Sequence, residues 1–118
     1  DWVPQLGNVV DLTERLIELH NSDWLKGGGN GLHPEFIVDL QAGGFEGVTQ
    51  LTFSMDVSYS HEAWRGRIRA SAGVAVSLPA ERVDAFDQEL AALLKERFPE
   101  DPIDIPHRVF AAIGWTSA

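Results

Sequence analysis

The sequence contains no cysteine and only half as many basic as acidic residues. Without cysteine the chain can form no disulfide, no thiolate metal site and no thiol nucleophile. Nine Lys and Arg against 18 Asp and Glu give a formal net charge of −9. That charge argues against a nucleic-acid partner, because phosphate binding needs a broad basic face. The four histidines are scattered with no helical i, i+4 pair, so we expect no metal site.

Long apolar runs are lacking as well. No segment approaches the roughly 20 apolar residues of a membrane-spanning helix. The opening "DWVPQLGN" has neither the basic start nor the apolar core of a signal peptide. We therefore expect no membrane association and a cytoplasmic location. The sequence begins at Asp1 and its only methionine is Met55, which predicts that it is part of a longer protein. Its 118 residues fit one domain.

Hydrophobic periodicity predicts an α/β chain in the order helix, helix, strand, helix, helix, strand. A helix capped by Asn8 should bury a stripe that includes Leu12, Leu16 and Leu19. After a glycine-rich loop at 27–31, a short helix should begin at Pro34 and bury one face. That buried face is expected to consist of Phe36, Ile37 and Leu40.

The alternation in "VTQLTFSMDVSY" predicts a strand over 48–58, and "IDIPHRVFAAIGW" predicts a second strand over 103–115. The second is apolar on both faces after His107, as in strands interior to a sheet. Two strands alone are marginal in water, so we expect one edge of a larger sheet. Residues 1–47 then form a helical region before the first strand, and 60–98 form a helical insertion between the two strands.

Four stretches carry a resemblance to a known family: "DWVPQLGNVVDLTERLIELHN", "GLHPEFIVDLQAGGFEGV", "SYSHEAWRGRIRASAGV" and "ERFPEDPIDIPHRVFAAI". Together they resemble the C-terminal half of bacterial class I S-adenosylmethionine-dependent methyltransferases. The resemblance implies the last part of a Rossmann-like sheet of seven strands. Residues 48–58 would be the sixth strand, and 103–115 the seventh, which runs antiparallel between the fifth and the sixth.

The resemblance implies S-adenosylmethionine as cofactor and a small-molecule acceptor as substrate. The family binds the methyl donor through a glycine-rich turn after its first strand and an acidic residue after its second. Neither is in this sequence, and no strand precedes the glycines at 27–29. We therefore expect these residues to be inactive on their own. The sheet would be completed by the rest of the protein, or by homo-oligomerisation through exposed strand edges.

Basic and aromatic residues gather in "SYSHEAWRGRIRAS". His61, at the start of a helix, is either the general base for the acceptor or a capping residue. Arg65 and Arg69 could pair with Glu62 or with the acidic helix that contains Asp84, Asp87 and Glu89. Alternatively, one arginine binds an acidic acceptor. We favour ion pairing for Arg69 and acceptor binding for Arg65.

Four more residues complete the candidate site. Tyr59 and Trp64 are candidate walls of the acceptor pocket, although aromatic residues at such positions are more often part of a core. His33 is a candidate acceptor contact on a lid, or a simple turn residue. Trp2, just past the implied fifth strand, is the candidate cofactor contact. The competing hypothesis is a non-enzymatic, dimeric α+β binding or interaction domain with an arginine-lined anion site.

Overall fold

The computed structural model describes residues 1–26 and 31–117. Within them the elements follow the predicted order: α1 (Val9–His20), α2 (Glu35–Ala42), β1 (Glu46–Tyr59), α3 (His61–Arg69), α4 (Ala80–Arg97) and β2 (Ile103–Trp115). The chain is therefore α/β, with four helices and a two-stranded antiparallel sheet in its described part. The loop predicted at 27–31 lies, except for Gly31, outside the described residues.

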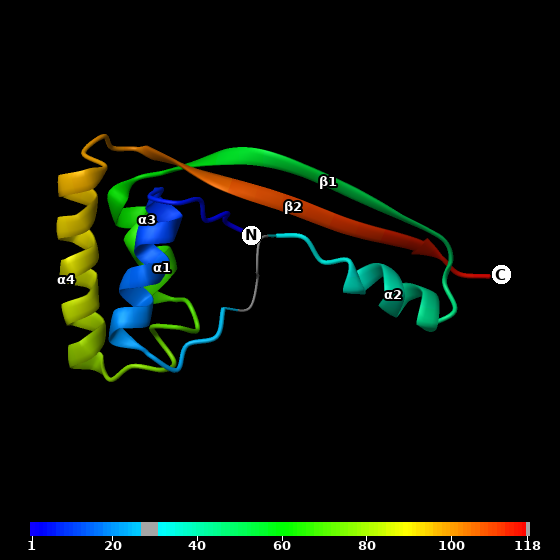
Figure 1. The fold of residues 1–118 in the computed structure, drawn as a ribbon, viewed down its shortest axis with the longest axis horizontal. Coiled ribbons are helices and arrows are strands. Elements are labelled where there is room, and N and C mark those ends of the chain that lie inside the picture. The colour runs from blue at the N-terminus through cyan, green and yellow to red at the C-terminus, as the bar shows by residue number, and fades with distance from the viewer. Residues whose placement is uncertain (27–30, 118) are drawn as a thin grey trace.

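The molecule is a long β ribbon with its helices divided between the two ends (Figure 1). Helices α1, α3 and α4 cluster at one end, and α2 lies along the other half of the ribbon (Figure 1). The principal extents are 54 × 30 × 23 Å and the radius of gyration is 17.3 Å. A compact domain of this length would have a radius of gyration of about 13.5 Å. Half of the ribbon therefore extends beyond the core.

The helices begin where side chains can cap them. The Asn8 side chain accepts a hydrogen bond from the amide of Asp11 at 2.8 Å, as predicted for α1. The Ser60 hydroxyl does the same for the amide of Ala63 at 3.0 Å and starts α3. Helix α3 ends at Arg69, and turns follow over 72–77. None of the described helices has the length and apolar character that crossing a bilayer demands.

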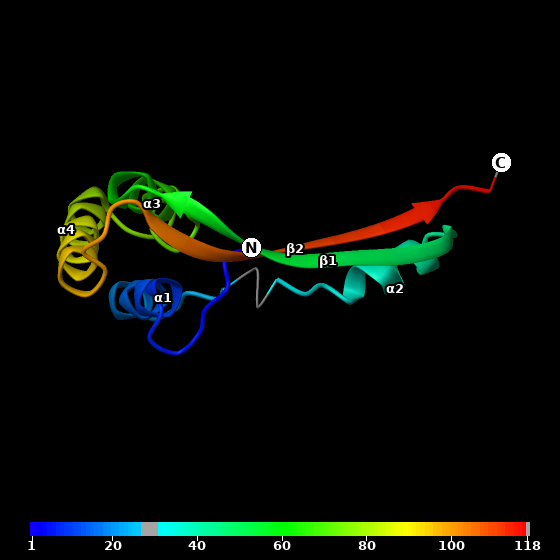
Figure 2. The ribbon, with the colours of Figure 1, turned by 90° about the horizontal axis from the view of Figure 1, so that it is seen from above.

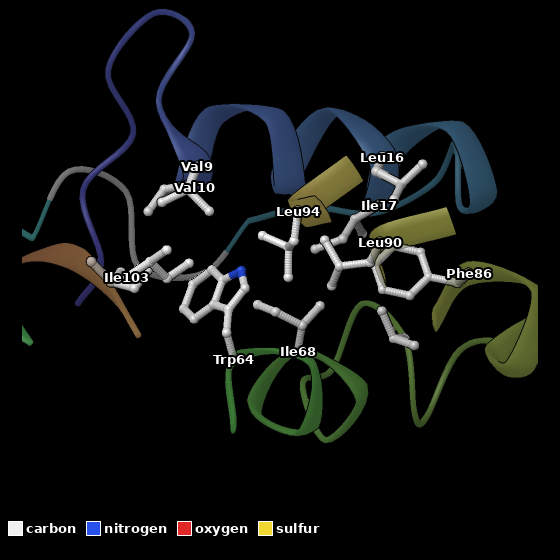
Figure 3. Packing of buried hydrophobic residues seen from close by; sticks show 12 residues of the cluster. Val9, Val10, Leu16, Ile17, Trp64, Ile68, Phe86, Leu90, Leu94 and Ile103 are labelled. Carbon is white, nitrogen blue, oxygen red and sulfur yellow. The ribbon is translucent and has the colours of Figure 1, made fainter. Parts of the chain in front are cut away.

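The core lies between α1, α3 and α4, where Trp64 is its largest fully buried side chain. Figure 3 shows the Trp64 ring rising from α3 toward α1. Its indole nitrogen donates a hydrogen bond to the Thr13 hydroxyl at 3.2 Å, and Thr13 in turn donates to the Val9 carbonyl at 2.7 Å. The buried indole N–H therefore has a partner, which removes the cost of an unsatisfied polar group.

The predicted apolar stripes are partly wrong. Leu16 is buried at 7% exposure, but Leu19 is 81% exposed, because α1 turns its Val10, Thr13 and Ile17 side toward the core. No residue of α2 is fully buried. Its Phe36 packs edge-on against Phe110 of β2 and is still 42% exposed. Helix α2 covers one face of the ribbon without reaching the core.

The two faces of the ribbon differ. Leu51, Phe53 and Met55 of β1 share one face, and between 46% and 54% of each is exposed. They pair with Ala111, Val109 and His107, in that order. Helix α2 lies on the opposite face, and Figure 2 shows no helix over this part of the first face. The apolar alternation predicted the strand correctly, but in this structure much of that face is uncovered.

Residues 1–3 run along the second edge of β2. The Val3 amide donates to the Pro106 carbonyl, and the Arg108 amide to the Asp1 carbonyl, each at 2.8 Å. Trp2 and His107 form the antiparallel bridge between them. At this point β2 therefore lies between two antiparallel neighbours, residues 1–3 and β1. The sequence predicted an interior strand for the apolar part after His107, but in the described structure the part of β2 after Arg108 pairs only with β1.

Replacing Leu16 by Ala should lower the free energy of unfolding by about 2–5 kcal/mol, because it leaves a cavity in the core. The matched change Leu19→Ala should cost no more than about 0.5 kcal/mol, because that side chain is exposed. Denaturant unfolding followed by circular dichroism measures both. Equal losses at the two positions would show that α1 packs through a different face.

Candidate functional site

One cavity of the molecule is lined by two tryptophans and by basic side chains. It has a volume of about 350 Å³ and lies between residues 1–2, the chain after α1, the end of α3 and β2. We call it the tryptophan cavity and define it by Trp2, Trp24, Lys26, Arg67, Gly73 and His107. Its volume falls in the range of small-molecule sites in proteins.

Trp2 is fixed on three sides. Its backbone bridges to His107, its indole nitrogen donates to the Glu14 carboxylate at 3.2 Å, and its ring stands edge-on to Trp64 at 5.4 Å. Trp64 also contacts the ring of Tyr59 at 5.5 Å, and Tyr59 stacks on His107 at 6.0 Å. This row of rings connects the core to the cavity. Trp2 therefore enters the cavity in a defined orientation.

Trp24 reaches the cavity because the chain turns sharply after α1. The Trp24 amide donates to the Asn21 carbonyl at 3.1 Å, and the Asn21 side chain donates to the Gly73 carbonyl at 3.1 Å. A Cβ atom at residue 73 would lie only 2.7 Å from the Trp24 indole nitrogen. Glycine at this position is therefore what allows the Trp24 ring to lie against the turn after α3.

The two cations of the cavity differ in their partners. Lys26 forms an ion pair with Glu14 at 2.7 Å, so its charge is balanced inside the protein. Arg67 forms no ion pair with any described residue, and its guanidinium carbon lies 5.3 Å from the centroid of the Trp2 ring. At this distance the guanidinium and the indole attract each other. Arg67 is thus the cation of the cavity that has no carboxylate partner among the described residues.

The other two arginines of α3 are bound to α4. Arg65 donates to both carboxylate oxygens of Asp87, and Arg69 donates to one of them at 2.8 Å. The pKa of Asp87 is lowered, and the main cause is the hydrogen bond from Arg65. Desolvation is the next largest effect and raises the pKa, and the hydrogen bond from Arg69 lowers it further. Both arginines are therefore ion-paired with Asp87. This agrees with the interpretation that we favoured for Arg69 and differs from the acceptor binding that we favoured for Arg65.

The two remaining histidine candidates lie outside this group. The His61 ring is bound to the Glu100 carbonyl at 2.7 Å, and its backbone amide donates to Asp101 at 3.0 Å. His33 contacts the Asp1 carboxylate at 2.6 Å and stacks on Phe36 at 4.7 Å. Among the described residues no group of acidic or histidine side chains could hold a metal ion.

The structure thus brings together three of the residues proposed from the sequence, Trp2, Tyr59 and Trp64. Of these only Trp2 lines the cavity, since Trp64 has no exposed surface and backs it. Sequence reasoning missed Trp24, Lys26, Arg67 and His107. One signal was present in the sequence. Arg67 lies on a different side of α3 from Arg65 and Arg69, so the three arginines could not share one partner.

A larger cavity, of about 640 Å³, lies near the end of α4 and is chemically different. Its lining includes the carboxylates of Asp56, Glu100 and Asp104 against the single cation of Arg97. An anionic ligand would meet net repulsion there. The tryptophan cavity is therefore the better candidate for an anionic or aromatic ligand.

The Arg65–Asp87–Arg69 cluster makes a prediction about pH. Asp87→Asn should lower the free energy of unfolding by about 1.5–3 kcal/mol at pH 7, because it weakens hydrogen bonds to charged groups. The pKa of Asp87 is depressed in the folded state, so its contribution exists above the pKa of an unfolded aspartate, about 3.9, and disappears as the pH falls through the folded value.

Urea unfolding of both forms between pH 7 and pH 2 measures this difference. Asp84→Asn, an exposed neighbour on α4, is the matched control and should show little change. A constant difference between Asp87→Asn and the native chain down to pH 2 would contradict the ion-pair assignment.

The chain matches no family model, no curated protein and no solved structure. Its function is therefore inferred from the arrangement of the sheet and the chemistry of the tryptophan cavity.

Proposed function

We propose that this chain is the C-terminal, acceptor-side part of a class I S-adenosylmethionine-dependent methyltransferase that acts on a small molecule. The observation that carries the proposal is the order of the sheet. Strand β2 lies antiparallel between residues 1–3 on one side and β1 on the other. In the resembled family the seventh strand lies in the same way between the fifth and the sixth, and the resemblance places residues 1–3 immediately after the fifth.

The uncovered part of the ribbon supports the same proposal. Leu51, Phe53 and Met55 are about half exposed, although a strand with this apolar alternation normally buries that face. The outer edge of β1 pairs with no other strand in the described structure. In the proposal these surfaces belong to a wider Rossmann-like layer, completed by more of the protein or by a second copy.

The chain does not hold the methyl donor by itself in this proposal. No described glycine turn joins a strand to a helix, as the phosphate-binding and donor-binding turns of such sheets do. The donor supplies an electrophilic methyl group, and it would be bound mainly by residues beyond this sequence. The residues of this chain would bind and orient the acceptor and keep water from it.

The tryptophan cavity is our candidate for acceptor binding, with Trp2 close to the end of the implied fifth strand. His61 as a general base stays a prediction. Its Nε2 faces a carbonyl oxygen and so must carry the proton, which leaves Nδ1 as the basic nitrogen of the neutral ring. The contacts of His61 fix the start of α3 against residues 100–101.

The competing candidate is a non-enzymatic interaction domain. The unpaired edge of β1 and the exposed face of Leu51, Phe53 and Met55 favour it, because such surfaces pair readily with another chain. Its arginine-lined anion site would then consist of Arg67, since Arg65 and Arg69 are bound to Asp87.

Calorimetry with S-adenosylhomocysteine separates the two candidates. The product of the whole gene that encodes this sequence should bind it, whereas the 118 residues alone should bind weakly or not at all. ATP, which shares the adenosine group but lacks the amino acid, is the control ligand and should not compete. If the whole product does not bind S-adenosylhomocysteine and forms a stable dimer, the interaction domain is the better description.

A further inference from the structure

We propose that the tryptophan cavity binds a flat aromatic molecule that carries a single carboxylate. The inference deepens the proposed function, and it depends on that function only in calling the bound molecule the methyl acceptor. Binding itself follows from side chains of this chain, and three properties of the cavity define the ligand: its aromatic walls, its net charge and its size.

The aromatic walls select a flat ring. Trp2 and Trp24 both line the cavity, and each is held by contacts that do not involve a ligand. Trp2 is bound through Glu14, and Trp24 lies against Gly73. Because both indoles are oriented before a ligand binds, a ligand ring can pack on them without the entropy loss of ordering these side chains. Aromatic rings gain free energy from such contacts beyond the area that they bury.

The charge selects one carboxylate. Lys26 is neutralised by Glu14, and the Asp1 carboxylate, which also lines the cavity, is bound by His33. The guanidinium of Arg67 is the cation of this cavity that has no carboxylate partner among the described residues. The Arg67 guanidinium carbon lies 5.3 Å from the centroid of the Trp2 ring, and we infer that the guanidinium N–H groups bind the ligand carboxylate through two hydrogen bonds. A dianion such as a phosphate monoester would leave one charge uncompensated.

The volume limits the size of the ligand. A cavity of about 350 Å³ is near the lower end of the range for small-molecule sites. It suits a ligand of one or two fused rings and is small for a peptide. The larger cavity near Arg97 is unsuitable for the same ligand, because three carboxylates line it.

Isothermal titration calorimetry with 2-naphthoate tests the proposal on the whole gene product, with no methyl donor added. The comparison ligands are 2-naphthamide, which has the same ring without the charge, and acetate, which has the charge without the ring. We expect 2-naphthoate to bind at least fivefold more tightly than 2-naphthamide, and acetate not to bind measurably.

Arg67→Gln should weaken 2-naphthoate roughly tenfold and leave 2-naphthamide unchanged, since only the carboxylate contact is lost. Arg97→Gln, an exposed arginine at the larger cavity, is the matched control and should change neither affinity. Trp24→Ala should weaken both naphthyl ligands. Circular dichroism spectra that match the native protein establish that each variant is folded.

The proposal is overturned if the native protein binds the acid and the amide equally, if it binds neither, or if Arg97→Gln rather than Arg67→Gln lowers the affinity. These outcomes differ from failure of the proposed function. A protein that binds S-adenosylhomocysteine but not 2-naphthoate has a different acceptor class. One that binds 2-naphthoate but not S-adenosylhomocysteine is a binding protein with the same cavity.

Discussion

The hydrogen bonding of β2 on both of its edges at 106–108 is the constraint on which the rest of the structure depends. Between β1 and residues 1–3 this short length of strand has antiparallel neighbours on either side. The bridge holds Trp2 beside His107, and the Trp2 indole, which lines the cavity, donates a hydrogen bond to Glu14 of α1. The order of the sheet and the position of the candidate site therefore have the same cause.

Trp64 connects this edge of the sheet to the core. Its ring contacts Trp2 and Tyr59, and its nitrogen is bound by Thr13 inside the three-helix cluster. A buried aromatic side chain with a satisfied polar atom packs in one orientation only. The buried Trp64 ring consequently supports the cavity from behind, while Arg67 on the same helix remains exposed to solvent.

The sequence predicted the elements well because their signals are local. Asn8 caps α1, and the period-two alternation around Phe53 predicts β1. Neither signal depends on which distant residues pack against the element. Partners distant in the sequence could not be predicted in this way. Arg65 and Arg67 are two positions apart on one helix, yet Asp87 binds the first and the Trp2 ring contacts the second. Which arginine stays available for a ligand depends on how α4 and residues 1–3 pack, and no local pattern reports that packing.

The open edge of β1 has a consequence for how the polypeptide behaves while it is being made. Between Glu46 and Asp56 the strand carries no charge and no proline, and its edge offers backbone donors and acceptors in a row. Such a segment can form cross-β stacks with other chains when its edge is unpaired. The charges of Glu46 and Asp56 at its two ends limit the length of the aggregation-prone segment. An exposed segment of this kind is prone to aggregate while the chain is incompletely folded.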